Sequence, residues 1–241
     1  MSMLLPDVLL IPYAADQWSL AAMKLGRATR RGIGIEASFP LMVVNKARRE
    51  PLRLNNAPWV LNPQTTAGQS VTETLRAHVR QMCRPWDRTA QAFVDAYFDH
   101  LLKEATDDAA LRERSETFAN LYAPLDWLYS APRPLPRAHL YAPEAAPTGT
   151  EADFVQVDFA FWLGGTLTAA VSKDAGLSPP KARARVERLA NAGITRVVSF
   201  SVADLTEPQR LFTDLLDGPP SRYWSQDPVP CGPFRPRLFD D

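Results

Sequence analysis

Two apolar runs separated by a glycine pair constrain this chain more than any other feature of its sequence. Phe154 to Leu163 and Thr166 to Ser172 have the composition of β-strands, and Gly164-Gly165 stands between them. A two-residue turn between antiparallel strands needs positive φ angles, which glycine adopts readily. The sequence therefore predicts a β-hairpin over residues 154–172 that is closed by a two-residue turn.

The hairpin decides which side chains lie opposite one another. With a two-residue turn, Asp158 lies opposite Val171 and diagonal to Lys173, so that Asp158 and Lys173 share a face. A bulge or a three-residue loop would shift this pairing. A carboxylate inside an apolar strand is costly unless it is paired or bound to a metal. Asp158 is therefore a candidate site residue if the strand is central, and an ordinary residue if it faces solvent.

The residues around the hairpin predict an α/β arrangement. Over residues 115–216 we expect the order helix, strand, strand, strand, helix, strand, helix. Apart from the hairpin, the expected elements are a helix capped by Ser115, a strand over Arg137–Tyr141, a helix from Pro179 to about Asn191 that Gly193 ends, a strand over Ile194–Val202 and a helix over Glu207–Leu216.

Residues 1–110 predict a mixed or mainly helical region in which we find no known motif. A basic segment over residues 27–36 contains two glycines and follows Gly26, but the spacing of these three glycines matches no phosphate-binding loop, and we interpret the segment as a solvated loop. The other expected elements are strands within Leu4–Ile11 and Phe39–Val44, helices over Ala14–Leu25, Ser70–Cys83 and Ala90–Leu102, and a helix or linker over Asp107–Arg114.

Several short motifs follow one another in a familiar order in the second half of the chain. They are Glu116, Val157-Asp158-Phe159, Ala170-Val171-Ser172-Lys173-Asp174, Arg185, Leu189, Gly193 and Val197-Val198-Ser199-Phe200. In this order they resemble the PD-(D/E)xK superfamily, and most closely the branch of the very-short-patch repair endonucleases. The resemblance implies a restriction-endonuclease-like core over residues 115–217, αβββαβα with a mixed sheet flanked by helices. The proline-rich tail over residues 218–241 is expected to pack on this core.

The resemblance also implies a chemistry. Hydrolysis of a phosphodiester uses a divalent metal that activates water, and a lysine that assists it. The residues implied in catalysis are Asp158, Lys173, Asp174 and Glu116, with Asp158 and Asp174 as ligands of Mg²⁺. The pattern departs from the family at the second carboxylate, because either Val171 or Ser172 occupies that position, depending on the alignment. This departure puts metal binding and cleavage in question.

The candidate residues also have plain interpretations. Lys181, Arg185 and Arg188 form a basic stripe on the expected helix, which is either a solvated face or a contact surface for DNA. Glu116 in a first helical turn is equally explained by the helix dipole. Lys173 and Asp174 also suit the polar end of a strand. His139 lies on an expected strand near the core, whereas His78 and His100 are interpreted as surface or packing residues.

Composition excludes few partners. The formal net charge is zero, with 27 basic and 27 acidic side chains, so only a local patch could attract nucleic acid. Cys83 and Cys231 are the two cysteines, and their separation gives neither a zinc motif nor a reason to expect a disulfide. No apolar run approaches the length of a membrane span. We therefore expect a cytoplasmic protein without zinc and without a membrane partner.

Two functions remain open at this point. The first is a degenerate or atypical metal-dependent DNA nuclease of a bacterial restriction or defence system. The alternative is a catalytically inactive nuclease-fold subunit that acts as a scaffold or as a nucleic-acid-binding partner in a larger complex. A third possibility, a small-molecule enzyme on an unrelated α/β fold, lacks a nucleophile elbow, a phosphate loop or a catalytic triad in the sequence.

Overall fold

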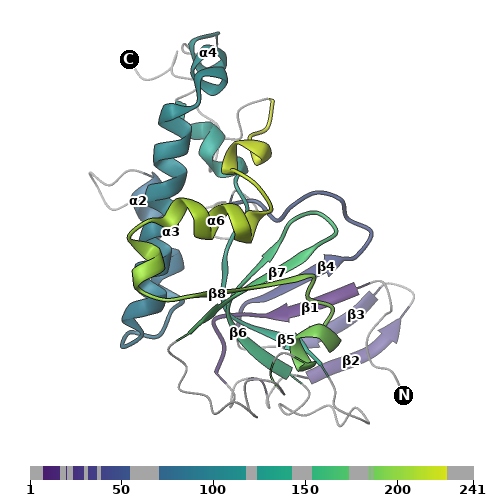
Figure 1. The fold of residues 1–241 in the computed structure, drawn as a ribbon. Coiled ribbons are helices and arrows are strands. Elements are labelled where there is room, and N and C mark those ends of the chain that lie inside the picture. Colours follow the sequence, from purple (N-terminus) through teal and green to yellow (C-terminus); the bar gives the residue numbers. More distant parts are fainter. Residues whose placement is uncertain are drawn as a thin grey trace.

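The computed structural model describes residues 8–16, 20, 24–29, 32–36, 39–54, 71–117, 124–142, 154–173, 185 and 187–226. The chain has a mixed α/β fold (Figure 1). The strands are β1 (Val8–Pro12), β2 (Lys24–Thr29), β3 (Gly32–Glu36), β4 (Leu41–Asn45), β5 (Leu135–Tyr141), β6 (Phe154–Trp162), β7 (Leu167–Ser172) and β8 (Arg196–Phe200). The α-helices are α2 (Val71–Gln81), α3 (Arg88–Asp107), α4 (Ala109–Thr117) and α6 (Pro208–Leu216), and the 3₁₀ helices are η3 (Pro124–Ser130), η5 (Ala203–Leu205) and η6 (Pro220–Tyr223).

The largest sheet has four strands in the order β5-β6-β7-β8. β5 and β7 both run antiparallel to β6, whereas β8 runs parallel to β7. Residues 187–191 are helical and precede β8. The sheet is therefore mixed, as the sequence predicts.

The β6–β7 hairpin confirms the predicted turn and register. Phe159 pairs with Ala170 and Trp162 pairs with Leu167, which is the pairing that a two-residue turn produces, and this ladder contains no bulge. Gly164 and Gly165 have φ angles of 84° and 103°. A Cβ atom on Gly164 would lie 2.1 Å from the carbonyl oxygen of Arg49, so the turn also packs closely against the N-terminal half of the chain.

The sheet is buried between two apolar cores, which explains why β6 and β7 are apolar at consecutive positions. The first core joins α2, α3 and α6 to one side of the sheet, and includes Phe93, Tyr97, Phe159, Phe161, Phe200 and Phe212. The second core joins β1 and β4 to the sheet and to the helical residues before β8, and includes Ile11, Val44, Ala160, Trp162, Ala169 and Leu189.

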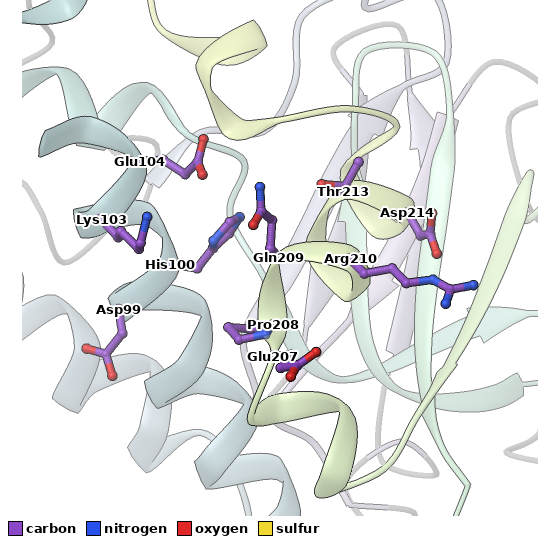
Figure 2. A pocket seen from close by; sticks show the side chains of 10 residues that line it. All are labelled: Asp99, His100, Lys103, Glu104, Glu207, Pro208, Gln209, Arg210, Thr213 and Asp214. Atoms are coloured by element: carbon purple, nitrogen blue, oxygen red, sulfur yellow. The ribbon is translucent and has the colours of Figure 1, made fainter. Parts of the chain in front are cut away.

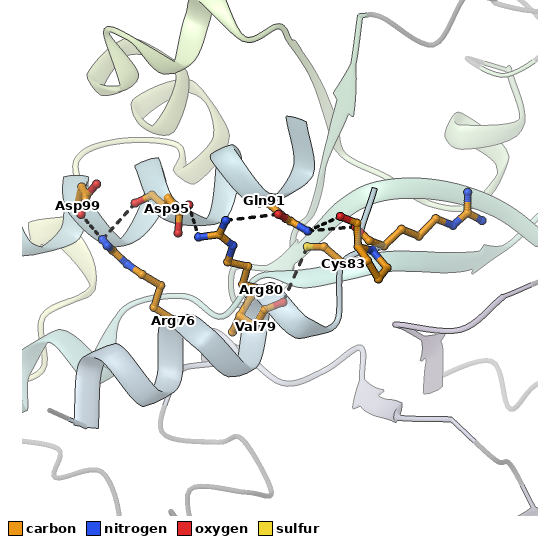
Figure 3. A network of polar contacts seen from close by, with 9 residues as sticks. Arg76, Val79, Arg80, Cys83, Gln91, Asp95 and Asp99 are labelled. Atoms are coloured by element: carbon orange, nitrogen blue, oxygen red, sulfur yellow. Dashed lines mark hydrogen bonds and ion pairs between the residues drawn. The ribbon is translucent and has the colours of Figure 1, made fainter. Parts of the chain in front are cut away.

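Helices α2 and α3 lie side by side and are joined by ion pairs along their exposed faces (Figure 3). Arg80 contacts Asp95, with 2.9 Å between nitrogen and oxygen, and Arg76 pairs with Asp99. Both helices were predicted from their apolar spacing, and Leu75 in α2 is buried as that spacing requires. These helices belong to residues 1–110, so the segment without a known motif supplies part of the first core.

The N-terminal segment is also tied to the sheet through its backbone. The amide of Leu52 donates to the carbonyl of Trp162 at 3.0 Å, and the amide of Arg133 donates to the carbonyl of Leu52 at 2.7 Å. Ala14 donates its amide to the carbonyl of Pro136 at 2.8 Å, beside the start of β5.

One local prediction for the N-terminal half is wrong, because the expected loop over residues 27–36 is largely replaced by the antiparallel pair β2 and β3. The expected helix over Ala14–Leu25 is contradicted only at its end, where Lys24 and Leu25 belong to β2. Leu20 is helical and donates its amide to the carbonyl of Asp16 at 3.1 Å, whereas residues 17–19 and 21–23 lie outside the described residues. The glycines suggested a loop, but the alternating isoleucines at positions 33 and 35 suit a strand. Phe39–Val44 was predicted as a strand and is confirmed as β4.

The helix start at Ser115 is also wrong. Ser115 and Glu116 lie in the last turn of α4, and the Ser115 hydroxyl donates to the carbonyl of Arg112 at 2.8 Å. The real start of α4 follows Asp108, whose carboxylate accepts from the amide of Leu111. An aspartate followed by two alanines was the stronger start signal. Tyr223 and Trp224, near the start of the proline-rich tail, are buried in the first core.

Candidate functional site

Asp158 is the central residue of the site that the sequence suggests, and its carboxylate lies within the sheet. It projects from β6, and its Oδ2 accepts a hydrogen bond from the backbone amide of Ser172 at 2.7 Å. Burial raises the pKa of Asp158, while the Ser172 amide and the Arg185 guanidinium act in the opposite direction. The side chain therefore has a defined structural partner.

The charges around Asp158 are close to balanced. Arg185 and Arg84 stabilise the ionised carboxylate, and Asp87 destabilises it. Arg84 and Asp87 come from the turn between α2 and α3, and no sequence pattern connects this turn with Asp158. Among the described groups that act on the Asp158 carboxylate, two are guanidinium groups and one is a second carboxylate.

In the observed register Asp158 has no second carboxylate opposite it, and Asp174, the other implied ligand of Mg²⁺, lies outside the described residues. Magnesium prefers several oxygen ligands in octahedral geometry. In the observed register the next residue pair after Phe159 and Ala170 brings Val171 opposite Asp158, and valine offers no ligand atom. Within the described ranges, no group of three or more histidine, cysteine, aspartate or glutamate side chains is arranged to hold a metal.

Lys173 is engaged away from Asp158. Its ammonium contacts the carboxylate of Asp204 at 3.0 Å, in the 3₁₀ helix η5 that follows β8. Asp204 also accepts from the amide and the hydroxyl of Ser201, at 2.8 and 2.7 Å. These hydrogen bonds, together with the Lys173 ammonium, lower the pKa of Asp204 to about 2. The structure therefore pairs the implied catalytic lysine with an acid that the sequence did not single out.

The basic stripe has a structural use in the part that is described. Arg185 donates to the carbonyl of Gln156 at 3.0 Å, and Arg188 donates to the carbonyl of Phe154 at 3.0 Å. Both carbonyls belong to the part of β6 that extends beyond its ladder with β7. The two guanidinium groups thus supply donors where β7 supplies none.

The remaining candidates are separate from Asp158 or lie outside the described residues. Glu116 is exposed at the end of α4. Asp174 and Lys181 lie outside the described residues. His139 is buried, as expected for a strand near the core, and its Nε2 lies 3.3 Å from the carbonyl oxygen of Ala15.

A second candidate site is a cavity between α3 and α6, and the sequence analysis assigned no function to the residues that line it. A cavity of about 660 Å³ is lined there by His100, Glu104, Glu207, Gln209, Arg210 and Asp214, among others (Figure 2). A neighbouring cavity of about 430 Å³ shares Glu207, Arg210 and Asp214 and reaches Lys173 and Asp204. Sequence reasoning did not identify this site because its acidic residues have the spacing of an ordinary solvated helix face.

Comparisons of the chain with family models, with curated proteins and with solved structures found no match. In the described part of the chain, no helix is both long and apolar enough to cross a membrane.

Proposed function

We propose that this chain is a non-catalytic protein with a nuclease-like core, and that it serves as a scaffold subunit in a larger complex. The strand directions support the core, because the resemblance implies three antiparallel strands followed, after a helix, by a fourth. β5, β6, β7 and β8 have this order, with β8 parallel to β7. Fold alone does not decide activity, so the chemistry must be argued from the site.

The observation that carries the proposal is the environment of Asp158. Its carboxylate accepts the Ser172 amide within the sheet and lies near the arginines at positions 84 and 185. An active nuclease of this kind would need a second carboxylate directed at the same metal. Val171 is next to Asp158 in the register, and Lys173 is paired with Asp204. These contacts support a structural role for the residues that would otherwise be catalytic.

The scaffold role is favoured over nucleic-acid binding by the use of the basic stripe. The guanidinium groups of Arg185 and Arg188 both donate to main-chain carbonyls of β6. Groups committed in this way contribute less to phosphate contacts, which supply most of the affinity of proteins for DNA.

A cleavage assay tests the proposal directly. The purified full chain is incubated with supercoiled and single-stranded DNA in the presence of Mg²⁺ or Mn²⁺. We expect no cleavage above the level of Asp158→Ala. The matched control is Asp107→Ala, since Asp107 is an exposed acid at the end of α3. Metal-dependent cleavage that Asp158→Ala abolishes and Asp107→Ala retains would overturn the proposal.

A binding assay separates the scaffold role from a nucleic-acid role. Fluorescence anisotropy with labelled duplex and single-stranded DNA is measured at low and at physiological salt. We expect only weak binding that disappears at physiological salt. Submicromolar affinity at physiological salt would favour the nucleic-acid-binding form of the subunit instead.

A further inference from the structure

The cavity between α3 and α6 has the size of a ligand site. Its volume of about 660 Å³ lies within the usual range of small-molecule pockets. His100 and Glu104 come from α3, whereas Gln209 and Arg210 come from α6 (Figure 2). The two helices also contact each other through the first core, so the walls of the cavity are formed by packed elements.

His100 is the residue that suggests an occupant. The side chain is almost entirely buried, at 4% exposure, and its ring stacks on Phe212 with 5.4 Å between centroids. Its Nε2 atom has no hydrogen-bond partner among the described residues. Buried polar atoms without a partner are rare in folded proteins, and each one suggests a ligand, a water or a functional role. In Figure 2 the imidazole is directed towards the middle of the cavity.

The charges that line the cavity define which occupant would be favoured. Asp99 pairs with Arg76, and Lys103 pairs with Asp107 at 2.6 Å, so each of these two lining residues has a partner of opposite charge. The other charged residues of the lining form no ion pair within the described ranges; they are Glu104, Glu207, Asp214 and Arg210. Three carboxylates against one guanidinium leave a negative site.

We propose that this cavity binds an organic cation, an alkylammonium or guanidinium group, that donates a hydrogen bond to Nε2 of His100 between the carboxylates of Glu104 and Glu207. In Figure 2 Glu104 and Glu207 lie on opposite sides of the imidazole. A charged donor forms stronger hydrogen bonds than a neutral one, and the carboxylates balance its charge.

The protonation state of His100 suits this role. Burial, and to a smaller degree the Lys103 ammonium, lower the pKa of His100 below its ordinary value of 6.5. The imidazole is therefore neutral at pH 7, and the ring nitrogen that carries no hydrogen accepts a hydrogen bond. A protonated imidazole would instead repel a cation.

The neighbouring cavity allows the occupant to be longer than a single cationic group. It shares Glu207, Arg210 and Asp214 with the first cavity and extends to the pair of Lys173 and Asp204. The cation could therefore be a free polyamine or the side chain of a lysine or arginine within a peptide. Both sources present the same group to His100.

Histidine-selective NMR tests the proposal, because the chain contains only three histidines, at positions 78, 100 and 139. The imidazole signals of the full chain are recorded with ¹⁵N-labelled histidine and assigned with His100→Phe. Spermidine is titrated as the free amine, and a blocked Lys-Gly-Lys tripeptide as the protein-like source. Succinate and 1,4-butanediol are the anionic and neutral controls.

We expect a saturable shift of the His100 Nε2 signal with at least one cationic probe and none with the controls. A shift with spermidine alone assigns a small-molecule ligand, and a shift with the tripeptide alone assigns a peptide. Removing one carboxylate should weaken the affinity roughly tenfold, as expected when a charged hydrogen bond is lost. The variants are Glu104→Gln and Glu207→Gln, and the control is Glu113→Gln on the exposed face of α4.

The proposal is overturned if no cationic probe shifts the His100 signal, or if succinate shifts it equally. It is also overturned if Glu104→Gln and Glu207→Gln bind as tightly as Glu113→Gln. Circular dichroism of each variant establishes that the fold is retained. The site is independent of Asp158, so its failure would leave the scaffold proposal unchanged.

Discussion

The carboxylate of Asp158 accepts a hydrogen bond from the backbone amide of Ser172 at 2.7 Å. This bond joins β6 to β7 just beyond the end of their ladder, where Phe159 pairs with Ala170. A side chain thus takes over from the main chain at the end of the ladder. The resemblance to the nuclease superfamily implies that this same carboxylate is a metal ligand. A hydrogen-bond acceptor needs only an oxygen atom, whereas a metal ligand needs the negative charge, and variants of Asp158 separate these two roles.

Asp158→Ala should destabilise the protein by about 1–3 kcal/mol, because the Ser172 amide would lose its acceptor in a buried place. Asp158→Asn keeps an oxygen acceptor of the same shape and should cost less than half as much. Urea denaturation followed by circular dichroism measures both. Equal losses in the two variants would mean that the charge of Asp158, and not the hydrogen bond, is what matters.

The pair of Arg133 and Tyr13 should be a sensitive point of the fold. Arg133 is 2% exposed, its Nη2 donates to the Tyr13 hydroxyl at 2.9 Å, and its guanidinium lies 5.3 Å from the centre of the Tyr13 ring. Tyr13→Phe should lower the free energy of unfolding by about 1–3 kcal/mol, since a buried cation loses its acceptor. Arg133→Met removes the buried charge itself and should be less harmful when combined with Tyr13→Phe. A double-mutant cycle in urea gives the coupling, and additive losses would contradict this account.

The ionised carboxylate of Asp204 should stabilise the folded protein, and this stabilisation should be lost at acidic pH. Its pKa is about 2 in the folded chain, below the ordinary 3.8, because of Ser201 and Lys173. The stabilisation is therefore complete above pH 3.8 and is lost as the pH falls towards 2. The difference in unfolding free energy between wild type and Asp204→Asn should follow this curve, and Lys173→Met should reproduce part of it. Since the pair is exposed, added salt should reduce the difference. A difference that is constant from pH 2 to 6 would refute the assignment.

Two glycines allow a matched comparison of turn positions. Gly164 and Gly193 both have positive φ, but a Cβ on Gly164 would meet the Arg49 carbonyl oxygen, whereas a Cβ on Gly193 would meet nothing within 4 Å. Gly193→Ala should cost about 1–2 kcal/mol from backbone conformation alone. Gly164→Ala should cost clearly more, because the backbone of Arg49 must also move. Thermal melting of the two variants measures the order, and equal melting temperatures would argue against the close approach at Arg49.

The thiol of Cys83 should be inert in the folded protein. It is 3% exposed, and burial raises its pKa to about 12. Only roughly one molecule in ten thousand would carry a thiolate at pH 8, and the thiolate is the reactive form. In a Cys231→Ser background, Ellman's reagent should react with Cys83 only as fast as the protein opens, and should react at once in urea. Rapid reaction without denaturant would contradict the buried position.

Local signals were enough to predict the centre of the fold. The hairpin and its register followed from Gly164-Gly165 and the flanking apolar runs, and α2 and α3 followed from their helical spacing. These elements were predictable because the residues that specify them are adjacent in sequence. The pair β2 and β3 was missed because basic residues and glycines outweighed a short alternating pattern.

The candidate site was less predictable, because its contacts join distant parts of the chain. Asp158 was identified from one strand, but Arg84 and Asp87 reach it from the turn before α3. Likewise, nothing in the local sequence distinguishes His100 from an ordinary packing residue. Its isolated Nε2 becomes visible only when α6 is placed against α3.

The tie between Tyr13 and Arg133 spans 120 positions, and the Gly164 turn rests on Arg49. The second core, which contains Tyr13, can therefore not be completed until the beginning of the chain has met a segment made much later. Proteins rich in such distant contacts fold slowly, because the entropic cost of closing long loops comes before the stabilisation from the contacts. During synthesis on the ribosome, β1 and β4 would wait with apolar faces uncovered until β5 and β6 had emerged.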